Sequence, residues 1–192
     1  MIKQCLKIIS IASLFSFSLS LFSANLPSWK ILPNQSNITF TAIQNHAPVS
    51  GQFKRFNGKI IADTEHYQAS EIEINIDIAS LTASYRDLVS MLLSAEWFDV
   101  KKYPTATFKA NNFKKINENT YLATGELTIR DKTSPLTLTF TLEKNTQGYA
   151  IVQGYTTIKR TFFGVGQGSW AETDTINDEV KITFKIAAQK VT

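Results

Sequence analysis

The residue types that most often carry catalysis or bind metals are scarce in this chain of 192 residues, which has one cysteine and two histidines. Cys5 lies in an N-terminal segment that we expect to be removed, which excludes disulfides, thiol catalysis and thiolate metal sites from the remainder. His46 and His66 fall in segments with the composition of loops. Asp63, Glu65 and His66 match no specific metal-binding spacing, and no Gly-x-Ser-x-Gly nucleophile motif occurs. The residues themselves therefore indicate no catalytic site and no metal site.

A long apolar run is also missing beyond residue 24, so no later segment reaches the length of about 20 residues that a membrane-spanning helix needs. At the start of the chain, Lys3 and Lys7 precede a stretch from Ile8 to Phe22 that is almost wholly apolar or serine. This pattern predicts a secretory signal peptide over residues 1–24 and a mature domain over residues 25–192, with a retained membrane anchor as the alternative. We expect a periplasmic or secreted protein that does not span the membrane once mature.

A strong excess of one charge is absent as well. Without Lys3 and Lys7, 18 lysines and arginines face 16 aspartates and glutamates, and the basic residues are scattered. This balance gives no case for nucleic-acid binding. The glycines between Gly164 and Gly168 lack the preceding strand and following helix that a nucleotide-binding loop requires.

Strict alternation of polar and apolar residues is the strongest pattern that is present. It occurs in residues 71–78, 136–142 and 180–186. Successive side chains of a strand point to opposite faces, so each of these segments predicts a strand with one wet and one dry face. Further strands are expected over residues 29–32, 38–42, 51–61, 106–113, 120–130 and 149–159. The prediction is an all-β chain, with a closed antiparallel barrel favoured over a sandwich.

One segment has a different period. In residues 85–98 the apolar side chains, among them Leu88, Leu92 and Trp97, recur at spacings of three and four, which predicts a helix. Ser84 is expected to cap the start of this helix, with Asp87 three residues further on.

Several sequence blocks, taken together and in order, resemble the YceI family of periplasmic, lipocalin-like proteins. The resemblance runs from Trp29 to about Lys190. The blocks are WKILPNQS at 29–36, GQFKRFNG at 51–58, WFD at 97–99, YPTATF at 103–108, GELTIRD at 125–131 and FGVG at 163–166. The resemblance implies an extended eight-stranded antiparallel barrel with one short helical insertion, which encloses a long apolar channel. It implies binding of a polyisoprenoid or another long-chain amphipathic lipid, and no catalytic residue.

The candidate ligand-binding residues are the apolar side chains on the inward face of each strand and on the apolar face of the helix. We expect the helix, together with Phe98, to close one end of the channel. The predicted channel residues are Phe40, Ile74, Ile76, Leu88, Leu92, Trp97, Phe98, Phe108, Leu127, Ile129, Leu138, Phe140, Ile182 and Phe184. The predicted mouth residues are Arg86, Arg160, Gln167 and Trp170.

These observations favour a non-catalytic carrier of an isoprenoid, quinone-like or fatty-acid-derived lipid, without a cofactor, and with a homodimer as a possible assembly. Two alternatives stay open. An exposed apolar patch instead of a cavity would favour an accessory protein that binds a partner in a membrane redox or stress-response system. Ionisable residues converging at the mouth would instead favour a lipid-modifying enzyme.

Overall fold

The computed structural model describes residues 26–146 and 148–191. The expected signal peptide, residues 1–24, and Cys5 lie outside the described residues. Within them, no helix is long and apolar enough to cross a membrane.

Strands account for most of the described chain. They are β1 (Ser28–Ile31), β2 (Asn37–Gln44), β3 (Ala47–Phe53), β4 (Phe56–Ile61), β5 (Glu71–Asp77), β6 (Leu81–Ala83), β7 (Thr105–Lys115), β8 (Thr120–Ile129), β9 (Lys132–Thr146), β10 (Tyr149–Lys159) and β11 (Glu179–Lys190). The α-helix α1 covers Arg86–Leu93. Short 3-10 turns are η1 (Pro33–Gln35), η2 (Tyr67–Ala69), η3 (Ile78–Ser80), η4 (Thr161–Phe163) and η5 (Gly168–Trp170).

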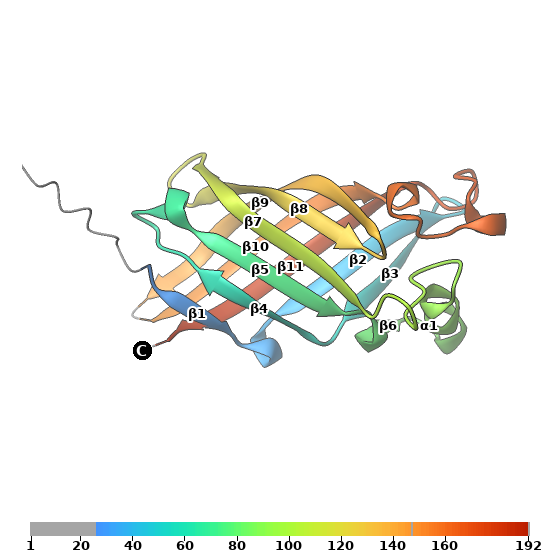
Figure 1. Ribbon diagram of the computed structural model, residues 1–192, viewed down its shortest axis with the longest axis horizontal. Helices are drawn as coiled ribbons and strands as arrows, with labels where there is room; N and C mark the ends of the chain where they lie inside the picture. The colour runs from blue at the N-terminus through green and yellow to red at the C-terminus, as the bar shows by residue number, and fades with distance from the viewer. Residues whose placement is uncertain (1–25, 147, 192) are drawn as a thin grey trace, which may run out of the picture.

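All strand pairings are antiparallel, and the sheet closes on itself (Figure 1). β11 pairs with β1 through Ile31 and Ala188, and with β2 through Phe40 and Ile182. In the same way β4 pairs with β1, and β3 with β2. The pairs β1–β2, β3–β4 and β5–β6 therefore each act as one interrupted strand, so the eleven segments form a barrel of eight strands. This confirms the predicted all-β, eight-stranded antiparallel barrel with one helical insertion.

The turn between β2 and β3 shows how local sequence sets this pairing. Asn45 and His46 form a two-residue connection, with φ angles of 48° and 64°. Two consecutive residues in the left-handed region match the right-handed twist of the flanking strands. His46 thus lies in a tight turn, as its loop-like surroundings predict.

The helix is shorter than its apolar period suggests. Ser94 adopts an extended conformation and ends α1, so Trp97 and Phe98 lie beyond the helix and not on it. The apolar spacing continues because residues 94–100 wind in tight turns, in which the Trp97 amide donates to the carbonyl of Ser94. The predicted capping box is wrong: Tyr85 occupies the N-cap position, and no side chain caps the helix.

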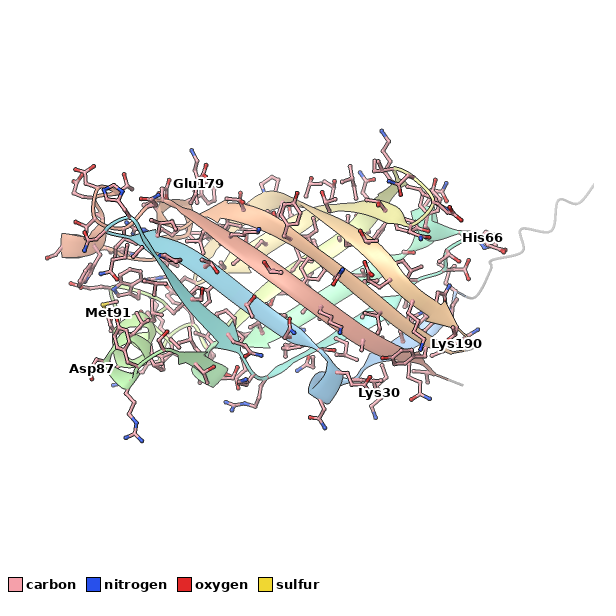
Figure 2. The ribbon with its side chains drawn as sticks, turned by 180° about the vertical axis from the view of Figure 1, so that it is seen from behind. Lys30, His66, Asp87, Met91, Glu179 and Lys190 are labelled. Atoms are coloured by element: carbon pink, nitrogen blue, oxygen red, sulfur yellow. The ribbon has the colours of Figure 1, made fainter. Side chains whose placement is uncertain are left out.

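The two ends of the barrel differ in their cover. At one end, called the helix end below, lie α1, the β8–β9 turn and residues 160–178 (Figure 1). At the other, called the terminal end, lie η2, the β7–β8 and β9–β10 hairpins and the C-terminus (Figure 1). Figure 2 places Asp87 and Met91 at the helix end, and His66 and Lys190 at the terminal end.

Candidate ligand-binding cavity

A cavity of about 520 Å³ runs through the barrel, from Trp97 and Val165 at the helix end to Trp29 and Lys190 at the terminal end. This volume falls within the range of about 300–1,000 Å³ that is typical of small-molecule sites. The 15 residues of β9, at about 3.3 Å each and a tilt of about 40°, span roughly 40 Å along the barrel axis. The space is therefore long and narrow.

The burial of the inward side chains shows that the centre is hollow. On β5, Ile72, Ile74 and Ile76 all line the cavity, yet they are only partly buried. Each therefore keeps exposed surface although it lines the cavity, whereas Ile78, the first residue of η3 directly after β5, is 2% exposed. A solid core would have covered these isoleucines as fully as Ile78.

Gly154 in the barrel wall allows the neighbouring Phe184 ring to lie close to the backbone of β10. A Cβ atom at Gly154 would come within 2.8 Å of the Phe184 ring on the neighbouring strand. Because glycine has no such atom, the Phe184 ring lies against the wall at this point.

Most of the predicted channel residues border the cavity. They are Phe40, Ile74, Ile76, Leu92, Trp97, Phe98, Phe108, Leu127, Ile129, Leu138, Phe140, Ile182 and Phe184. Leu88 is the exception, because it packs in the apolar core and does not line the cavity. Whether these side chains contact a ligand stays a prediction.

Aromatic side chains gather near both ends of the cavity. At the helix end, the Phe53 ring lies 5.8 Å from that of Phe40 and 6.0 Å from that of Phe98. At the terminal end, the Tyr121 ring stacks on Phe140 at 5.6 Å and meets the edge of Tyr67 at 5.8 Å. Between these clusters the wall is apolar, with aliphatic side chains and the rings of Phe108 and Phe184.

Arg160 holds the helix end together. Its guanidinium group is buried, with the residue 3% exposed, and its five N–H groups donate only to backbone carbonyls. The acceptors are Val165, Gly166, Glu172, Ile176 and Asn177, at 2.9 to 3.3 Å. Burial lowers the pKa of Arg160, and the nearby charge of Asp178 opposes this effect. An arginine still stays protonated in such a place, so the group is a cation that ties residues 165–177 together.

Arg130 fastens the segment after α1 in a similar way. Its Nη1 donates to the carbonyls of Ala95, Trp97 and Gly164, and its Nη2 lies 4.0 Å from the Asp99 carboxylate. The β8–β9 turn is thereby linked both to residues 95–99 and to the loop after β10.

Of the four predicted mouth residues only Arg160 lines the cavity, and a role of these residues as a mouth stays a prediction. Arg86 is exposed on α1 and does not line the cavity, and the Gln167 amide instead donates to the Gly164 carbonyl at 2.8 Å. The Trp170 ring packs 5.7 Å from that of Trp97, but Trp170 does not line the cavity. Arg160 does border the cavity, but all its N–H donors are occupied.

The polar opening lies at the terminal end. Asp63, Thr64, Asn145, Thr146 and Lys190 line the cavity there, and the last three are exposed. The sequence analysis missed this rim, since loop composition alone carries no signal of what a loop faces.

The Asp63 carboxylate orders the loop that leads to η2. It accepts hydrogen bonds from the backbone N–H groups of Glu65 and His66, at 2.8 and 3.0 Å. Partial burial raises the pKa of Asp63, but these hydrogen bonds lower it further, and the net pKa lies below its ordinary value. The rim therefore carries both a carboxylate, from Asp63, and the side chain of Lys190. Asp63, Glu65 and His66 do not form a metal-binding group, and none was found among the described residues.

Comparisons with known proteins agree with this architecture. The family model of the YceI-like domain matches residues 29–188. A UPF0312 protein of Pseudomonas putida strain W619 is 31% identical over 139 residues, which cover 70% of this chain and 72% of the relative. A UPF0312 protein of Vibrio cholerae strain N16961 is 25% identical over 171 residues, 88% of this chain and 78% of the relative.

Solved structures with the same fold include BcnA of Burkholderia cenocepacia. It has a TM-score of 0.79 and 30% identity, and the match covers 83% of this chain and 99% of BcnA. A polyisoprenoid binding domain from Saccharophagus degradans has a TM-score of 0.68 at 14% identity, over 85% of this chain and 98% of that domain. The latter likeness shows the fold alone.

Proposed function

The chain belongs to the YceI-like domain family, and we propose on that premise that it is a non-catalytic carrier that holds one long-chain amphipathic lipid inside its barrel. A polyisoprenoid is the class named for a solved structure of the same fold. The observation that carries the proposal is the apolar hollow of about 520 Å³ along the barrel.

Hydrocarbon burial supplies the driving force for binding. Each CH₂ group moved from water into the cavity contributes about 0.8 kcal/mol. Ordering a flexible tail opposes this gain, and measured affinities do not exceed about −21 kcal/mol. The length of the cavity then sets how much of a tail is sheltered.

The lining indicates the orientation of the ligand. Ile129, Phe163 and Val165 surround the covered helix end, whereas Asp63 and Lys190 stand at the open terminal end. The tail would therefore point toward α1, with the polar head at the terminal end. A carrier of this kind would work after export to the periplasm or cell exterior, once a signal peptide over residues 1–24 is removed.

Analysis of the purified protein by organic-solvent extraction and mass spectrometry tests the proposal. We expect a long-chain lipid to co-extract at about one molecule per chain, because a tail in the cavity is shielded from water. Mock eluates from the same host without the protein are the control. Folded protein that yields no lipid, and that takes up no added long-chain alcohol, would contradict the carrier function.

An accessory role through a protein partner is the second candidate. Tyr85 and Phe162, which are 55% and 54% exposed, both lie at the helix end. Exposed aromatic side chains are common at protein interfaces. An empty barrel in the extraction experiment would favour this role. A lipid-modifying activity finds no support in the charged residues of the cavity lining, which are Asp63, Arg160 and Lys190.

A further inference from the structure

We propose that Tyr121 selects the polar group of the ligand, by a hydrogen bond from its hydroxyl to an uncharged, oxygen-bearing head group. This inference rests on the proposed carrier function and adds the chemical class of the head to it. The head-group subsite consists of Tyr67, Tyr121 and Phe140.

The position of Tyr121 is set by three elements. It lies on β8 in the same inward phase as Ala123 and Leu127, it lines the cavity, and it is 5% exposed. Its ring stacks on Phe140 of β9 with an interplanar angle of 17°, and Tyr67 of η2 meets it edge-on at 66°. The ring is therefore held between two other aromatic rings.

The loop that carries Tyr67 is itself anchored. The Trp29 indole N–H donates to the Ala62 carbonyl at 2.8 Å, and the Ala62 amide donates to Pro27 at 3.1 Å. Together with the Asp63 turn, these bonds hold η2 against the opening. These hydrogen bonds thus fix the position of Tyr67 in the head-group subsite.

The hydroxyl of Tyr121 makes no hydrogen bond to any residue that the structure describes. It also differs from the two completely covered unpaired atoms in that part of the chain, Trp97 Nε1 and Arg130 Nε, because it keeps some accessible surface. Buried tyrosine hydroxyls usually have a partner. A nearly buried phenol with an unpaired but accessible O–H, on the wall of a cavity, is suited to a partner inside that cavity.

The surroundings of the subsite favour a head group without charge. Lys115, which does not line the cavity, places its ammonium group 5.7 Å from the centre of the Tyr121 ring, and Lys190 and Asp63 lie on the rim. Both lysines are exposed to water, and the Asp63 carboxylate already accepts two backbone hydrogen bonds from its own loop. What remains for the ligand is one hydroxyl and aromatic faces, which match an alcohol or carbonyl oxygen attached to an apolar chain.

Displacement of a fluorescent apolar probe by hexadecanol, hexadecane and hexadecyl phosphate tests the inference. Wild-type protein should bind hexadecanol more tightly than hexadecane or the phosphate. In Tyr121→Phe, hexadecanol binding should weaken about three- to tenfold, the usual effect of one hydrogen bond. Binding of hexadecane, which has no oxygen, should not change.

Tyr149→Phe is the matched control. Tyr149 lies at the same end but outside the cavity lining, where its hydroxyl donates to the Gln35 side chain at 2.7 Å. The Tyr149→Phe substitution should leave the affinities for all three ligands unchanged, and thermal melting will show whether both variants are folded.

The outcomes separate the two proposals. Wild-type protein that binds neither hexadecanol nor hexadecane overturns the carrier function. Binding of both with no loss of alcohol preference in Tyr121→Phe overturns the role of Tyr121 alone. Tighter binding of hexadecyl phosphate than of hexadecanol overturns the uncharged head group.

Discussion

Replacement of Leu138 by tryptophan is expected to weaken binding of a long-chain lipid by at least about a hundredfold. Leu138 lies on the inward face of β9, borders the cavity and is only partly buried. An indole there would fill the lumen midway and keep the tail from its deeper half. Four CH₂ groups kept in water forfeit about 3 kcal/mol in total, which is more than a hundredfold in Kd. Titration with hexadecanol, or lipid content after purification, measures the effect.

The adjacent residue provides the control for this substitution. Thr139 lies next to Leu138 on β9 but on its outer phase, where it pairs with the exposed Tyr155. Thr139→Trp should leave both binding and lipid content as in the wild type. Equal binding by the two variants, with both folded, would show that the tail does not occupy the lumen at Leu138.

Replacement of Arg160 by methionine is expected to lower the free energy of unfolding by about 3–5 kcal/mol. Methionine replaces the apolar stem of the arginine but has no donors, so five carbonyls of residues 165–177 lose their hydrogen bonds. A buried acceptor left unpaired costs about 1–3 kcal/mol, and partial access of water limits the total. Guanidinium chloride unfolding measures the loss.

Two further variants test the reason for this loss. An ammonium group has three donors and no planar fork, so Arg160→Lys should lie between wild type and Arg160→Met. Arg86→Met, on the exposed first turn of α1, should change stability by less than about 0.5 kcal/mol. If Arg160→Met is within 1 kcal/mol of the wild type, the carbonyl network does not hold the helix end.

These two predictions assign different tasks to the two ends of the barrel. At the helix end, Nη1 of Arg130 and all the N–H groups of Arg160 donate to backbone carbonyls and fix the cover in place. At the terminal end, the exposed Asn145, Thr146 and Lys190 leave a way in. If the chain carries a lipid as proposed, we expect the ligand to exchange at the terminal end, near η2.

The strand pattern could be predicted from the sequence because it is local. In residues 71–78 each side chain alternates with its neighbour, and this alone predicts which isoleucines point inward. The same rule correctly placed Phe108, Leu127 and Ile182 on the cavity wall. Tyr121 has the inward phase of Leu127 and could have been found in this way.

The helix segment shows where a local pattern misleads. Leu88, Leu92 and Trp97 share one period, but the helix ends at Leu93, and Leu88 turns into the core away from the cavity. The spacing of apolar residues predicts which side chains are shielded from water. It does not predict whether they pack against other side chains or line a cavity.

The sequence by itself determined the family, the all-β class and the inward phase of most strands, since each follows from short-range alternation and motif order. Only the tertiary structure decided that the centre is hollow, that Arg160 binds backbone carbonyls, and that the opening lies at Asp63 and Lys190. These properties depend on residues distant in the chain, brought together when β11 closes on β1 and β2. Closure sets the width of the lumen and the neighbours of each loop, and no single strand contains that information.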